Sequence, residues 1–168
     1  MPAEDSTFRS SMRLLAGGVT IVATAFEGRR SGLTATAVCS LALAPPRILV
    51  SINMQGLTYE FVSRSRCMSV NLLAKDHENL AERFAAKRAA RDENRFVLGE
   101  WKTKLTGAPL LTDALAALDC QVTEIIPLDT HAILIGVVEG VLFGPRRPPL
   151  IHFEAGFTSL APLPENMS

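Results

Sequence analysis

Short apolar runs, rich in β-branched residues, alternate with groups of turn-forming residues along most of this 168-residue chain. Runs of this length and composition, bounded by Gly, Pro, Asn or Asp, predict strands. The segment EGRR predicts a turn between the first two runs, and Pro45-Pro46 predicts the end of the second, because proline cannot donate to a ladder. Strands are predicted at Val19–Phe26, Gly32–Pro45, Arg47–Asn53 and Cys67–Leu73, within Pro109–Leu128, at His131–Gly144, and as a final hairpin at Leu150–Leu160.

Apolar residues at helical spacing occur in fewer places. Phe8 and Met12 follow Ser6, a predicted N-cap, and the pair Gly17-Gly18 predicts the end of this first helix. Strands joined by hairpins, with few inserted helices, predict a mainly β fold, a closed antiparallel barrel with peripheral helices. The length predicts one domain over residues 1–168. The remaining helices are predicted at Gly56–Ser65 and Lys75–Ala90, and the charged run Lys87–Asn94 is interpreted as a surface loop.

Charge and cysteine content exclude several classes of partner. Lys plus Arg and Asp plus Glu each number 17, so a net charge of zero gives no reason to expect nucleic acid or an anionic membrane. The three cysteines are odd in number and lie far apart, which argues against a disulfide framework or a zinc site and favours the cytoplasm. We see no signal peptide and no apolar run suited to a membrane span.

The segment Gly32 to Ser40 is unusual because its side chains are small and partly polar. Thr34, Ala35, Thr36 and Ala37, with Ser40 beyond them, leave backbone N–H groups accessible, so the edge of a planar heterocycle could lie against them. A tightly packed hairpin whose threonines favour strands would give the same composition.

Five further residues are candidates for chemistry. Ser51 and Asn53 point to the same side of their strand and suggest a polar wall, or equally a solvent-facing one. His131 begins an apolar strand, where it could orient a nucleotide or simply cap the strand. Arg95 and Phe96 could hold a phosphate or form ordinary surface. No GxGxxG, GxxxxGK[ST], GxSxG or HExxH is present. The sequence therefore lacks the motifs typical of dinucleotide-binding domains, P-loop proteins, hydrolases and zinc proteases.

These strings together resemble a known family. GLTATAVCS, a proline pair and ILVSIN are similar to the core signature of short-chain flavin reductases, the reductase components of two-component flavin monooxygenases. FRSSMRLLAGGVTIVAT, CMSVNLL, ERFAA, NRF, GAPLLTDALAALDCQV, DTHAILIGVV and LIHFEAGF match in the same order, from Phe8 to Leu160. The string TATAVCS and the Thr-His dipeptide are especially similar to those of 4-hydroxyphenylacetate 3-monooxygenase reductases and pyrimidine-utilisation flavin reductases.

The resemblance implies an FMN-binding split β-barrel, a homodimer with the flavin near the subunit boundary. FMN or FAD would bind without a covalent bond, and NADH or NADPH would fold over the ring, which needs no dinucleotide-binding domain. Asp129-Thr130 before the histidine departs from the family's usual Gly-Asp or Gly-Thr. Carried over by position, Thr34, Ala35, Thr36 and Ala37 would line the flavin with Ser51, Asn53 and Ser40, Arg95 and Phe96 would lie on its phosphate side, and His131 would face the nicotinamide.

The implied reaction is hydride transfer from nicotinamide C4 to flavin N5, in which the cofactors supply the chemistry. The reduced flavin would then serve a partner oxygenase. Three alternatives stay open: a reductase of another acceptor such as a ferric chelate or a corrinoid, a flavin carrier or sensor without turnover, and a β-barrel interaction domain that binds no flavin.

Overall fold

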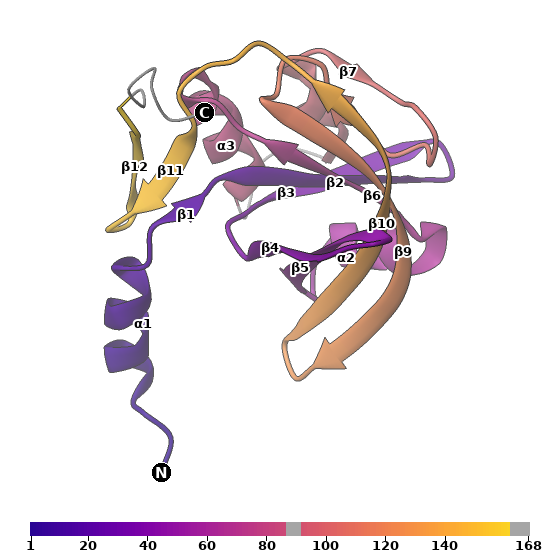
Figure 1. Cartoon of the computed structure of the whole chain (residues 1–168). Helices are drawn as coiled ribbons and strands as arrows, with labels where there is room; N and C mark the ends of the chain where they lie inside the picture. The colour runs from indigo at the N-terminus through magenta and orange to yellow at the C-terminus, as the bar shows by residue number, and fades with distance from the viewer. Residues whose placement is uncertain (87–91, 162–168) are drawn as a thin grey trace.

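The computed structural model describes residues 1–86 and 92–161. A seven-stranded antiparallel sheet curls through the body of the molecule (Figure 1). Its strands, in spatial order, are β3 (Arg29–Ala35), β2 (Thr20–Phe26), β6 (Cys67–Leu72), β9 (Ala116–Leu128), β10 (His131–Phe143), β5 (Pro46–Asn53) and β4 (Val38–Leu43).

Strands β3 and β4 are consecutive in sequence but form opposite edges of this sheet. The chain crosses from one edge to the other at Thr36 and Ala37, so the barrel is joined there by the covalent chain and the two edges do not pair. The expected closed barrel is therefore wrong, and the split barrel implied by the resemblance is confirmed. The single strand predicted over Gly32–Pro45 is likewise two strands.

A tight turn explains this break. The Val38 N–H donates to the Thr36 carbonyl at 3.0 Å, which makes a three-residue turn centred on Ala37. The Ala37 carbonyl then accepts the Ser51 N–H at 3.0 Å, so Ala37 already belongs to the β5 side of the sheet. Neither Thr36 nor Ala37 is one of the residues, such as glycine or proline, that usually mark a turn.

The core consists of two apolar clusters on the two faces of the sheet. Alternate residues of β2 enter different clusters: Ile21 and Ala23 pack in one with Phe84, and Val22 packs in the other with Met68. Helices α2 (Leu57–Ser65) and α3 (Glu78–Ala85) pack on β2 and β3. The helix predicted over Lys75–Ala90 is shorter than expected, because it begins as the 3-10 turn η1 (Lys75–His77) and the backbone is extended at Ala86. Residues 87–90 of that prediction, and residues 87–91 of the predicted surface loop, lie outside the described residues.

Smaller elements surround the barrel. A second sheet has the order β1 (Gly17–Gly18), β11 (Leu150–Phe153) and β12 (Gly156–Ser159), so the glycine pair predicted to end a helix is instead a short strand. Strands β7 (Trp101–Lys102) and β8 (Leu110–Leu111) pair with each other, and η2 spans Asp92–Val97. Helix α1 (Asp5–Arg13) has no buried residue and projects from the body (Figure 1). Across the described ranges we find no helix with the length and apolar composition needed to cross a membrane.

Candidate functional site

The crossing turn between β3 and β4 is the exposed part of the stretch Thr34–Ala37, which is predicted to line the flavin. Thr36 and Ala37 are both exposed. Among the described residues, no hydrogen-bond acceptor is found for the N–H group of either one. Two adjacent donors under small side chains can approach the carbonyl oxygens and ring nitrogens of a flat heterocycle. The turn therefore has the accessible donors that the predicted flavin contact needs, and the contact itself stays a prediction.

The two residues before the turn are used differently. The Thr34 hydroxyl donates to the Ala81 carbonyl of α3 at 2.6 Å. The Ala35 side chain is buried in the barrel cluster, and its carbonyl accepts the Thr20 hydroxyl at 2.8 Å. Of the four residues predicted to line the flavin, only Thr36 and Ala37 are thus brought to the surface. Thr34 and Ala35 fix the end of β3 behind them.

Three other predicted residues extend this site along β5. Ser51 is bonded through its N–H to Ala37 and is half-buried, while Asn53 is exposed and its Oδ1 accepts the Gln55 N–H at 2.7 Å. His131 is the direct cross-strand partner of Asn53 and is exposed, with Nδ1 2.9 Å from the Thr130 hydroxyl. Because residues two apart lie on one face of a strand, Ser51, Asn53 and His131 form a continuous polar edge that begins at Ala37.

Ser40 does not lie on this edge. It pairs with Ile48, whose side chain points into the barrel cluster, whereas Ser51 is on the other face of β5. Ser40 and Ala37 are an odd number of positions apart, so their side chains point to opposite faces of the strand. The composition of the segment does not show which face each residue takes.

Arg95 and Phe96 lie behind β3. The Arg95 guanidinium donates to the carbonyls of Gly32 at 2.7 Å and Ala86 at 2.8 Å. The Phe96 side chain is 4% exposed and packs edge-on against Phe84, with ring centroids 5.0 Å apart. The hydrogen bonds of Arg95 and the packing of Phe96 hold η2 against β3 and α3. Gly32 is four residues from Thr36, about 13 Å along the strand. The predicted contact of this pair with a cofactor phosphate stays a prediction.

Sequence reasoning missed the neighbourhood of β1. A Cβ built on Gly17 would lie 3.4 Å from the Thr36 Cβ, so Gly17 flanks the crossing turn directly. A Gly-Gly dipeptide after a helical pattern signals a helix end as readily as a strand, and no local signal connects it to Thr36.

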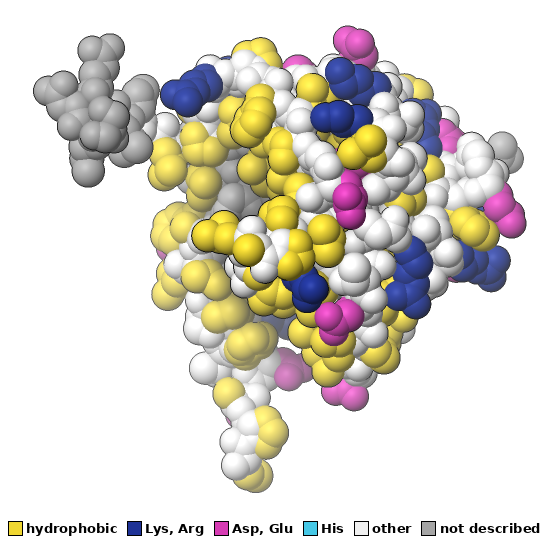
Figure 2. Space-filling model, turned by 45° about the vertical axis from the view of Figure 1, so that its right-hand side comes forward, with side chains coloured by type: hydrophobic (Ala, Val, Ile, Leu, Met, Phe, Trp, Pro, Cys, Tyr) yellow, Lys and Arg dark blue, Asp and Glu magenta, His cyan; other side chains and the backbone are white. Residues whose placement is uncertain are grey.

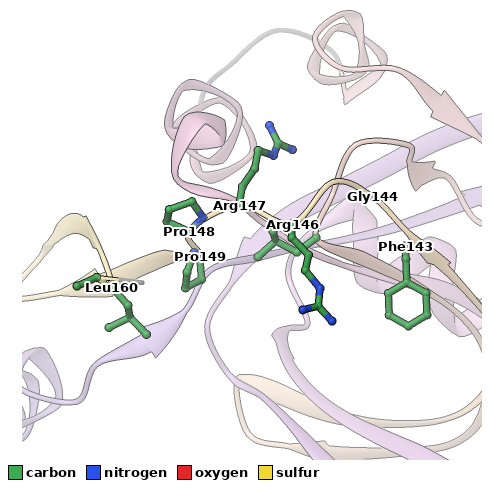
Figure 3. Close-up of a pocket in the computed structure, with 9 residues that line it drawn as sticks. Phe143, Gly144, Arg146, Arg147, Pro148, Pro149 and Leu160 are labelled. Atoms are coloured by element: carbon green, nitrogen blue, oxygen red, sulfur yellow. The ribbon is translucent and has the colours of Figure 1, made fainter. Parts of the chain in front are cut away.

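A cavity of about 1190 Å³ lies between the end of β10 and the start of β11 (Figure 3). In Figure 3, Arg146 and Arg147 point in opposite directions from its rim. Arg147 is held by the Asp76 carboxylate and the Asp113 carbonyl, whereas Arg146 has no ion pair among the described residues. Its lining is mostly apolar and comprises Leu115, Phe143, Gly144, Arg146, Arg147, Pro148, Pro149, Leu160 and Ala161. Within the described residues, no group of three His, Cys, Asp or Glu side chains could hold a metal ion.

Comparisons with known proteins show the family of this chain. The family model described as "Flavin reductase like domain" matches residues 12–161. The FMN reductase (NADH) RutF of Ancylobacter novellus is 37% identical over 158 residues, which cover 94% of this chain and 86% of the relative.

Solved structures show the same fold. A flavin reductase of Haemophilus somnus superposes with a TM-score of 0.89 at 36% identity, covering 94% of this chain and all of that one. The styrene monooxygenase flavin reductase of Pseudomonas putida S12 superposes with a TM-score of 0.82 at 26% identity, covering 94% of this chain and 99% of that one.

Proposed function

We propose that this chain, which belongs to the flavin reductase-like family, reduces FMN or FAD with a hydride taken from NADH or NADPH. The match over residues 12–161 carries the proposal. The name of the 37% identical relative supports FMN and NADH as the preferred pair. The accessible donors at Thr36 and Ala37 supply the second, independent support.

The bound flavin supplies the redox chemistry, because its ring can accept a hydride and pass electrons on. The protein's part is to bind and orient. The N–H groups of Thr36 and Ala37 donate to polar atoms at the ring edge, where such donors favour an electron-rich ring. Ser51 and Asn53 bind polar groups farther along β5, and His131 orients the nicotinamide at the end of the same edge.

The decisive experiment mixes purified protein, NADH and free FMN and follows the nicotinamide absorbance. We expect flavin-dependent loss of NADH, with FAD and NADPH tested in parallel to rank the substrates. Turnover with a ferric chelate or a corrinoid but with no free flavin would favour the alternative reductase. Flavin retention without NADH oxidation would favour a carrier or sensor, and no flavin binding at all would overturn the proposal.

We also propose that the protein is a cytoplasmic homodimer that delivers reduced flavin to an oxygenase. The solved relative from Pseudomonas putida is, by its name, the flavin reductase of a styrene monooxygenase. The three cysteines of this chain are unpaired, as suits a reducing compartment. Hydrophobic side chains gather on the body beside the projecting α1 (Figure 2), which supports a subunit interface there.

A further inference from the structure

We propose that β1 and β11 form a second wall of the flavin site, in which the His152 imidazole hydrogen-bonds to the bound flavin and Gly17 lets Thr36 pack close to this wall. This inference rests on the proposed function and adds to it a residue from the small sheet. It concerns the side of the crossing turn opposite to Ser51 and His131.

The pairing of β1 with β11 fixes the direction in which His152 points. Gly17 and His152 are direct cross-strand partners, so their Cβ directions lie on one face of the ladder. A Cβ on Gly17 would lie 3.4 Å from the Thr36 Cβ, which shows that this face looks toward the crossing turn. Cross-strand Cβ atoms are about 5 Å apart, so the His152 side chain starts beside the place where Thr36 packs on Gly17.

The His152 ring is placed to bind and has a group to offer. Its side chain is half-buried and rests edge-on against Phe157, with ring centroids 6.0 Å apart. Among the described residues, neither of its ring nitrogens has a hydrogen-bond partner. The aromatic contact orients the imidazole, and the unused nitrogens can donate to or accept from a polar ligand atom.

The two histidines then lie on opposite sides of the turn. His131 is reached from Ala37 through Ser51 and β10, whereas His152 is reached from Thr36 through Gly17 and β11. A planar ring that rests its edge on Thr36 and Ala37 would have one imidazole toward each end. A Cβ on Gly17 would already be in van der Waals contact with Thr36, so a larger side chain there would push the crossing turn away from this wall.

The test measures FMN dissociation constants by quenching of flavin fluorescence, with the visible spectrum of the bound flavin as a second readout. His152→Phe keeps the aromatic contact with Phe157 but removes the nitrogens, and we expect the dissociation constant to rise about five- to tenfold. Gly17→Val should raise it at least tenfold. Gly18→Val is the matched control, because a Cβ on Gly18 has no atom within 4 Å and projects from the other face, so its affinity should stay within twofold.

Thermal unfolding of each variant checks that the fold is kept, and if Gly17→Val does not fold, His152→Phe decides alone. Wild-type affinity and an unchanged flavin spectrum in His152→Phe would overturn this inference while leaving the reductase intact. Failure of the unmodified protein to bind FMN would instead overturn the proposed function, and the inference with it.

Discussion

At the scale of single residues, Thr36 is the position where the site is easiest to test. Its side chain is exposed beside the two accessible N–H groups, so Thr36→Trp would cover the donors without entering the core. We expect loss of FMN binding with an unchanged unfolding midpoint, measured by fluorescence titration and circular dichroism. Thr103→Trp is the control, because Thr103 is an exposed loop residue between β7 and β8. If Thr36→Trp bound FMN with unaltered affinity, the crossing turn would not be part of the flavin site.

The fold disfavours ionisation of the Cys120 thiol. Burial raises the pKa of its thiol from 9.0 to about 12, and the nearby charges of Asp119 and Glu139 add to the shift. In the unfolded chain the thiol ionises at lower pH than in the folded one. The stability that depends on the neutral thiol is therefore complete below about pH 9 and is lost as the pH rises toward 12.

This shift predicts a difference between two proteins in alkaline solution. The unfolding free energy of the wild type should fall more steeply above pH 9 than that of Cys120→Ala, by up to about 1.4 kcal/mol per pH unit. Urea denaturation at several pH values between 8 and 10.5 measures both slopes, and the comparison cancels the other groups that titrate in this range. Parallel slopes would contradict the buried neutral thiol.

At the scale of elements, the β11–β12 hairpin has a turn made from unfavourable residues. Glu154 and Ala155 both have positive φ, at 49° and 62°, where Asn and Gly are preferred. The double variant Glu154→Asn/Ala155→Gly should stabilise the protein by roughly 1 kcal/mol, which raises the melting temperature by about 2–4 °C. The Glu154 N–H bond to the Arg13 carbonyl, at 2.8 Å, can persist because it is a backbone bond.

Calorimetry measures this change, and Ala155→Val is the opposite control, since a β-branched residue is least tolerated at positive φ. A lower melting temperature in the Asn-Gly variant would show that the turn is held by something other than its local conformation.

Some strands could be predicted from the sequence and others could not. Four strands, β2, β5, β6 and β10, match their predictions to within one residue, because each alternates or concentrates apolar residues between clear turn signals. The break between β3 and β4 was not predictable in this way, since Thr36 favours strands and Ala37 is not a turn-forming residue. A two-residue strand such as β1 exists only because β11 pairs with it.

At the scale of the whole molecule, helix α1 buries none of its residues within a single chain. Phe8 and Met12 are 57% and 45% exposed, although they share the apolar side of the helix. If this side packs on a second copy, Phe8→Glu/Met12→Glu should convert the protein from a dimer to a monomer of 18.1 kDa. Light scattering after size exclusion measures the mass.

The control for this variant adds the same charge to the polar side of the helix, as Ser6→Glu/Ser10→Glu. It should leave the mass at twice 18.1 kDa. A wild-type protein that is already monomeric would contradict the proposed homodimer, and a dimeric Phe8→Glu/Met12→Glu variant would place the interface away from α1.

The sequence alone determined the mainly β composition, most strand positions and, through residue order, the resemblance to flavin reductases. These depend on local preference and on side-chain alternation, which each segment carries by itself. Only the tertiary structure decided that β3 and β4 lie on opposite edges, that Thr36 and Ala37 are exposed while Ala35 is buried, and that Gly17 and His152 lie beside them. Such neighbours are set by which strands pair, and pairing partners far apart in sequence leave no local mark.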